Sequence, residues 1–280
     1  MKIFQKTVLL FIITCLTVSV SYAKSNVALT DIQIIKKIKK IDKKINNSPD
    51  CAKFYIERGY LKFILKDYGS AIEDYTKAEE LEPNNSDIFY SRGRIWLERK
   101  NYESAIEDFD KSIELNKKNS KSYISRGIAK DRQEDYDGAL SDYNLAIKYN
   151  KHSRDAYINR GILKDKLSDY NGAIEDYKKT IKLCKYSPDA YFNMGLSNYK
   201  LGNYEQAVDN FTTAIEQNPN YSMAYYKRGQ TYLKLDNQQF AKSDFEQACK
   251  LNPANKNFKQ ALEEIDSQLK DMLKKTDFYY

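Results

Sequence analysis

Small and aromatic residues recur along most of this chain with a period of 34 residues. Glycines mark the period at Gly59, Gly93, Gly127, Gly161, Gly195 and Gly229. When each glycine is counted as position 8 of a repeat, position 20 is always Ala, and positions 4 and 24 are always Tyr or Phe. A fixed period of this length without insertions is typical of a repeat architecture.

Within each period the pattern predicts a pair of helices. A residue without a side chain at position 8 and a methyl group at position 20 allow two helices to approach closely, while the aromatic rings fill the space around the contact. Pro83, Pro219 and Pro253 stand at position 32, where a proline ring ends the second helix. Lys117, Lys151 and Lys185 replace this proline in repeats two to four. We expect six repeats, over residues 52–85, 86–119, 120–153, 154–187, 188–221 and 222–255.

Both flanks of the repeats have helical apolar patterns. In residues 24–51, Ile34, Ile38, Ile41 and Ile45 recur with helical spacing among many lysines, and residues 256–280 contain a similar apolar stripe that includes Phe258. The ends of a solenoid expose an apolar face and need a cover, so we interpret both segments as capping helices. Basic amphipathic helices also bind anionic membranes, so contact with a membrane surface through residues 31–47 is the alternative for the first.

Two segments show a resemblance to a known family. Residues 125–130 (Ser-Arg-Gly-Ile-Ala-Lys) and residues 135–143 (Asp-Tyr-Asp-Gly-Ala-Leu-Ser-Asp-Tyr) resemble the tetratricopeptide repeat, in the bacterial subtype with Arg before Gly. The resemblance extends over residues 52–255. It implies an all-α solenoid of six repeats that form a right-handed superhelix. It also implies that the first helices line a concave groove, which receives a peptide or a partner helix.

By the family pattern, positions 2, 5, 6, 9, 12 and 13 of the first helices face this groove. We expect apolar residues at positions 5 and 9 of repeats three to five to form an exposed stripe, asparagines at position 6 to bind a peptide backbone, and a basic ladder at position 13 to favour acidic flanks. A chaperone C-terminal tail is not expected, because the position-5 residues are apolar where the chaperone-binding clamp needs Lys. The expected partner-binding residues are Ile124, Ile128, Arg132, Ile158, Asn159, Ile162, Lys166, Phe192, Asn193, Leu196, Lys200, Lys227 and Lys234.

Comparison of the repeats also predicts ion pairs between positions 7 and 23. Arg at position 7 and Asp at position 23 occur together in five repeats, and both are lost together in repeat five, which has Met194 and Asn210. This joint loss favours pairing within a repeat over pairing between repeats. The predicted structural pairs are Arg58 with Asp74, Arg92 with Asp108, Arg126 with Asp142, Arg160 with Asp176, and Arg228 with Asp244.

Composition and motifs favour a binding protein over an enzyme. The chain has one histidine, His152, and no GxSxG, P-loop, HExxH or CxxC motif, so we expect neither catalysis nor a cofactor or metal. Acid pairs such as Glu107-Asp108 recur at equivalent repeat positions, which indicates a structural or solvated role. The excess of positive charge lies in residues 24–50, and the repeats are nearly neutral, so nucleic acid is not an expected partner.

We predict that the protein is exported. Lys2 and Lys6 precede an apolar run over residues 7–20, and Ser-Tyr-Ala follows at residues 21–23, which is the order found in a signal peptide. Cleavage near Ala23 would leave a periplasmic or secreted protein that begins at Lys24, with an uncleaved membrane anchor as the alternative. Intact-mass measurement of the native protein tests this prediction. A cytoplasmic protein that retains residues 1–23 would contradict it.

Overall fold

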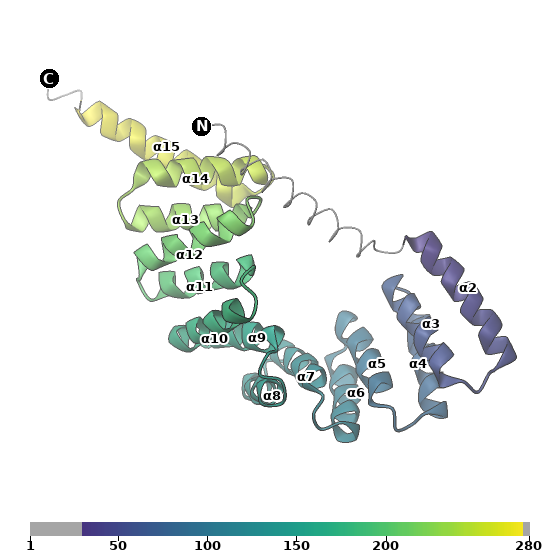
Figure 1. Cartoon of the computed structure of the whole chain (residues 1–280). Helices are drawn as coiled ribbons and strands as arrows, with labels where there is room; N and C mark the ends of the chain where they lie inside the picture. Colours follow the sequence, from purple (N-terminus) through teal and green to yellow (C-terminus); the bar gives the residue numbers. More distant parts are fainter. Residues whose placement is uncertain (1–29, 277–280) are drawn as a thin grey trace, which may run out of the picture. The chain divides into compact units, whose positions relative to one another are not determined.

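The computed structural model describes residues 30–276, so the predicted signal peptide, residues 1–23, lies outside the described residues. The described residues form fourteen helices and no strand. None of these helices is long and apolar enough to cross a membrane. The helices are α2 (Asp31–Asn47), α3 (Ala52–Ile64), α4 (Tyr68–Leu81), α5 (Ser86–Glu98), α6 (Tyr102–Leu115), α7 (Ser120–Arg132), α8 (Tyr136–Tyr149), α9 (Arg154–Lys166), α10 (Tyr170–Leu183), α11 (Pro188–Lys200), α12 (Tyr204–Gln217), α13 (Ser222–Lys234), α14 (Gln238–Leu251) and α15 (Lys256–Thr276) (Figure 1).

Helices α3 to α14 keep the 34-residue period of the sequence. First helices begin at residues 52, 86, 120, 154, 188 and 222, and second helices begin at residues 68, 102, 136, 170, 204 and 238. The chain divides into two compact units, Met1–Ile95 and Trp96–Tyr280. In the first unit α2 packs on α3 and α3 on α4, and in the second each helix from α6 to α14 packs on the next one along the chain. The fold is an all-α solenoid of tandem repeats.

The contact between position 8 and position 24 sets the distance between the two helices of a repeat. A Cβ atom on Gly127 in α7 would lie 2.7 Å from Cε1 of Tyr143 in α8. The Tyr143 ring is buried, as is Ala139 at position 20. The same arrangement recurs at Gly161 with Tyr177. The close approach predicted from glycine and alanine is present, because a side chain at position 8 would occupy the space of the aromatic ring.

A left-handed residue at position 15 forms the turn between the two helices of each repeat. Gly202 supplies it in repeat five with φ 79°, whereas the other repeats use non-glycine residues there, such as Lys66 with φ 61° and Ser168 with φ 65°. In three repeats an aspartate follows at position 16 and caps the second helix, as where Asp135 accepts a hydrogen bond from the backbone N–H of Gly138. This cap satisfies one of the free N–H groups of the first turn.

Apolar residues of α2 and α15 pack onto the neighbouring repeats. In α2, Ile34, Ile41 and Ile45 are buried in one core cluster with residues of α3, including Tyr55. At the other end, Phe258 and Ile265 of α15 are buried. The isoleucine face of α2, which a membrane-bound helix would need to expose, is therefore occupied by packing against α3.

Arg–Asp pairs connect the two helices of repeats one, three, four and six. The guanidinium Nη2 of Arg126 lies 2.5 Å from Oδ1 of the buried Asp142, and Lys130 lies 3.0 Å from the other carboxylate oxygen. Four of the five predicted pairs are present in this form, namely Arg58 with Asp74, Arg126 with Asp142, Arg160 with Asp176, and Arg228 with Asp244. The fifth prediction joins residues of different units. Within its own unit, Arg92 forms an ion pair with Glu79.

The same arginines also reach back to the preceding helix. Nη1 of Arg126 lies 2.5 Å from Asp110 in α6, and Nη1 of Arg160 lies 2.5 Å from Oδ1 of Asn144 in α8. In both cases the acceptor stands sixteen residues before the arginine. Each of these arginines therefore connects the two helices of its own repeat and also bonds to the helix before them. The sequence did not predict this second contact.

Repeat five replaces this charged cluster with a neutral one. The side-chain amide of Asn198 donates to Oδ1 of Asn210 at 2.8 Å, where repeats one, three and four have a Lys–Asp ion pair. Met194, in place of Arg, is buried against Ala173 and Tyr177. Burying an ion pair carries a large desolvation cost, so an apolar and amide set of similar volume can hold the same helices together.

We expect Asp142→Asn to lower the free energy of unfolding by about 2–3 kcal/mol. Removing one partner of a fully buried pair costs about 3–5 kcal/mol, and here Arg126 keeps Asp110 and some contact with solvent. The control, Asp110→Asn, should cost at most about 1 kcal/mol because Asp110 is 54% exposed. Urea unfolding followed by circular dichroism measures both.

The triple change Arg126→Met, Lys130→Asn and Asp142→Asn copies repeat five into repeat three. It should recover at least half of the stability lost in Asp142→Asn, because no buried charge is left unpaired, and Asp110, which loses Arg126, is 54% exposed. A triple variant that is less stable than Asp142→Asn alone would show that the neutral cluster depends on other features of repeat five.

Candidate functional site

The first helices of the second unit form one continuous layer. Helix α7 contacts α9, α9 contacts α11, and α11 contacts α13. We call the residues at positions 5, 6, 9 and 13 of these four helices the first-helix face. It contains all thirteen residues that the sequence predicted to bind a partner.

The apolar residues of this face do not form the exposed stripe that the sequence predicted. Only Ile162 is well exposed, at 44%. Four others are half-buried and pack against core clusters between the helices, namely Ile124, Ile128, Ile158 and Leu196. Most of the apolar surface at positions 5 and 9 is therefore used to hold neighbouring helices together.

The assignment of Phe192 to an exposed binding surface is wrong. Its side chain is only 9% exposed and belongs to the core cluster of α11 and α12. The ring packs against Phe211, with centroids 5.7 Å apart, and against Tyr221, at 4.9 Å. Phe192 stabilises the packing of repeat five, and a charged residue there would disrupt the fold.

The polar residues of the face differ in whether their side chains already have a partner within the protein. Asn159 and Asn193 are both half-buried, and the side-chain amide of Asn159 donates to the backbone oxygen of Asp155 at 2.7 Å. In the basic ladder, Lys166 forms an ion pair with Asp131 at 3.0 Å. The other members of the ladder, Arg132, Lys200 and Lys234, are exposed and form no ion pair with a described residue. The charge available to a ligand therefore lies mainly at the two ends of the ladder.

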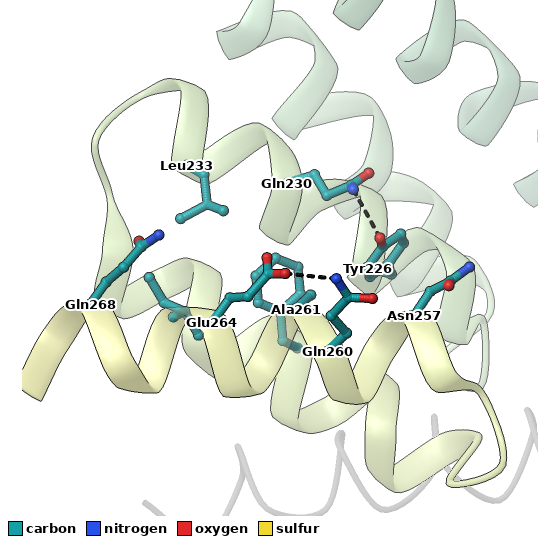
Figure 2. Close-up of a pocket in the computed structure, with 10 residues that line it drawn as sticks. Tyr226, Gln230, Leu233, Asn257, Gln260, Ala261, Glu264 and Gln268 are labelled. Atoms are coloured by element: carbon teal, nitrogen blue, oxygen red, sulfur yellow. Dashed lines mark hydrogen bonds between the residues drawn. The ribbon is translucent and has the colours of Figure 1, made fainter.

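A pocket that the sequence did not predict lies where α13 meets the C-terminal helix α15 (Figure 2). Its volume is about 210 Å³, and both helices contribute amide side chains to its walls. Gln230 donates to the hydroxyl of Tyr226 at 3.0 Å, and Gln260 donates to Glu264 at 2.8 Å. The lining residues drawn with labels in Figure 2 are Tyr226, Gln230, Leu233, Asn257, Gln260, Ala261, Glu264 and Gln268.

Lys227 stands beside this pocket with its charge uncompensated. Its ammonium group donates to Oε1 of Gln230 at 3.0 Å and lies 5.5 Å from the ring centroid of Tyr226, and both of these residues line the pocket. Burial lowers the pKa of Lys227, and the positive charge of Lys200 lowers it further. Among the described residues no carboxylate forms an ion pair with Lys227. The arrangement is suited to a negatively charged group from outside the chain.

A second polar cluster holds α9 and α11 together. The carboxylate of Asp165 accepts hydrogen bonds from the hydroxyl of Tyr177 at 2.6 Å and from that of Ser197 at 2.7 Å. Burial raises the pKa of Asp165 above its ordinary value, and the two hydrogen bonds oppose this rise. This cluster was not predicted from the sequence, because its three members lie at unrelated positions of two repeats.

Among the described residues, no group of three or more His, Cys, Asp or Glu side chains could hold a metal ion. Cys51, Cys184 and Cys249 are free thiols. The polar groups of the face and of the pocket are suited to hydrogen bonding and charge pairing with another molecule.

Four models of one repeat family match the chain. Models described as tetratricopeptide repeat match residues 46–120, 188–221 and 210–242, and a model described as TPR repeat matches residues 165–202. Together these matches include more than half of the chain. No curated protein sequence matches it.

Solved structures of tetratricopeptide repeat proteins have the same fold. YrrB, described as having an unusual peptide-binding site, is 22% identical with a TM-score of 0.58, and the match covers 69% of this chain and 99% of YrrB. MamA is 27% identical with a TM-score of 0.55, over 61% of this chain and 94% of MamA. PilF of Pseudomonas aeruginosa is 16% identical with a TM-score of 0.66, over 78% and 97%. The chain belongs to the tetratricopeptide repeat family.

Proposed function

We propose that this protein is a non-enzymatic, exported scaffold that binds an acidic segment of a partner protein at the pocket between α13 and the cap α15, beside Lys227. The observation on which the proposal depends is the half-buried ammonium group of Lys227, which has Lys200 as a charged neighbour and no carboxylate partner among the described residues. A buried charge without a counter-charge is costly, so a ligand carboxylate would gain affinity by supplying one.

The size of the pocket favours a polypeptide over a small molecule. Pockets that enclose small ligands measure about 300–1,000 Å³, whereas this one measures about 210 Å³. A single side chain of a larger partner fits such a volume. Gln230, Gln260 and Asn257 line it with amide groups that can both donate to and accept from a peptide backbone.

The relatives support a binding role in general terms. A tetratricopeptide repeat fold implies a scaffold for protein interactions, and the structure of YrrB is described as containing a peptide-binding site. The proposed ligand is an acidic segment with at least one large apolar side chain, which would contact Ile162 or enter the pocket. Export rests on the order of charged, apolar and small residues in residues 1–23.

We expect Lys227→Met to make the protein more stable while it weakens binding of acidic peptides. The change removes a charge that burial and Lys200 both disfavour. Differential scanning calorimetry should show a rise in Tm on the order of 1 °C. A stability change of about 1 kcal/mol moves Tm by about 2–4 °C in a domain of this size, and the effect of Lys227 should be smaller because its side chain is only half-buried. The matched control is Lys234→Met, which removes an exposed charge and should leave Tm unchanged.

The difference in stability between wild type and Lys227→Met should depend on pH in one direction. The pKa of Lys227 is lower in the folded protein than its ordinary value of 10.5. The cost of burying the charge is therefore fully present below the folded pKa and disappears as the pH rises from that pKa toward 10.5. The stabilities of wild type and Lys227→Met should converge over this range, and a gap that widens would contradict the assignment.

Selection from a displayed library of random 12-residue peptides tests the ligand class. Peptides enriched on the purified protein should contain Asp or Glu beside a large apolar residue. Lys200→Glu combined with Lys227→Glu should weaken the selected peptides at least about tenfold, because like charges would then face each other. The control, Lys178→Glu with Lys179→Glu, makes the same charge change on the exposed side of α10. Equal affinity for both double variants would rule the site out.

A further inference from the structure

A second hollow lies within the first unit, between α2 and α3. Its volume is about 510 Å³. Ile41 and Leu61 form a recessed floor and are 7% and 8% exposed. Tyr60 and Ile64 line the hollow from α3 and are 52% and 42% exposed. Exposed apolar residues gathered around a hollow usually mark a contact surface.

Lysines follow one edge of this hollow. Lys37, Lys40 and Lys44 line it from α2, and none of them forms an ion pair with a described residue. The ammonium group of Lys44 lies 5.3 Å from the ring centroid of Phe54 in α3. Glu57 lines the hollow from α3. The surface is therefore apolar at its centre, strongly positive along α2 and negative on the side of α3.

Capping of the repeats does not account for these residues. Ile34, Ile41 and Ile45 already cover the first repeat from α2. The lysines of the hollow stand on a different side of α2 from Lys36, Lys39 and Lys43, because a helix turns by 100° at each residue. A cap requires neither the lysine edge nor the exposed pair Tyr60 and Ile64.

We propose that this hollow binds an amphipathic helix of a partner protein, whose acidic edge lies along α2. Lys37, Lys40 and Lys44 are spaced i, i+3, i+7, and Tyr60 and Ile64 are spaced i, i+4. A helix presents its own residues at the same spacings, so it can place acids against the lysines and apolar side chains over the floor. A basic residue on its opposite edge would meet Glu57.

A membrane surface fits the hollow less well than a helix does. The apolar floor at Ile41 and Leu61 is recessed, so a flat bilayer would not reach it, whereas inserted side chains would. Glu57 would repel anionic lipid. This surface lies wholly in the first unit, and the Lys227 site lies in the second, so each can be tested without the other.

The test is selection of a displayed library of 18-residue helices on the purified protein. Enriched helices should carry an apolar stripe with Asp or Glu along one edge. Synthetic versions should bind about tenfold more tightly than copies with Lys in place of these acids. Lys37→Glu, Lys40→Glu and Lys44→Glu together should reverse that preference, and Tyr60→Ser with Ile64→Ser should abolish binding of both versions.

The matched control for charge is Lys36→Glu, Lys39→Glu and Lys43→Glu, which makes the same change on the far side of α2. It should alter affinity less than the change of Lys37, Lys40 and Lys44 does, because the control lysines do not line the hollow and water and salt screen them from a helix bound there. Phe240→Ser is the control for loss of an exposed apolar side chain, and circular dichroism of every variant should match that of wild type.

Three outcomes would overturn the proposal. Enriched helices that are basic, or that bind Tyr60→Ser with Ile64→Ser as well as they bind wild type, would exclude this surface. Binding to vesicles of phosphatidylglycerol, reduced equally by the two lysine triples, would identify a membrane contact instead. Self-association in sedimentation that is lost in Tyr60→Ser with Ile64→Ser would identify a second copy of this chain as the occupant.

Discussion

The close contact between a glycine and an aromatic ring determines how each repeat is built. At Gly127 the nearest ring atom of Tyr143 leaves no room for a Cβ atom. The glycine lies on the first helix and the ring on the second, so their contact sets the distance between the helices. Alanine at position 20 completes the contact without adding bulk. The outward positions of the first helices are not needed for this contact, so they can vary between repeats and acquire binding functions.

Buried charge links the repeats in addition to this contact. Asp142 accepts from Arg126 and Lys130, and Arg126 also bonds to Asp110 of the preceding helix. Every described polar side-chain atom that is deeply buried has a hydrogen-bond partner. Burial raises the pKa of Asp244 although Arg228 opposes the rise, which shows that desolvation remains costly even in a well-formed pair. In repeats three and four, the pairs join the first helix to the second helix of its repeat and to the helix before it.

The sequence predicted the fold well because the packing contacts repeat. The 34-residue period places Gly127 against Tyr143, and the joint loss of charge at Met194 and Asn210 identifies pairs within repeats. The binding surface was harder to predict, since the exposure of a side chain depends on neighbours outside its own repeat. Phe192 is buried by Phe211 and Tyr221, and the pocket beside Lys227 exists because α15 packs against the last repeat.

Departures from the period occur next to the proposed binding site. Lys178 stands sixteen residues before Met194, where the other repeats place an acceptor for the arginine. An arginine at residue 194 would face this lysine, so the neutral Met194 and the amide pair of Asn198 and Asn210 avoid a repulsion between like charges. Repeat five thus contributes Lys200 to the first-helix face without an arginine at its centre. The repeat of Lys227 keeps its own pair of Arg228 with Asp244, so the charge of Lys227 is in addition to this pair, and no described carboxylate forms an ion pair with it.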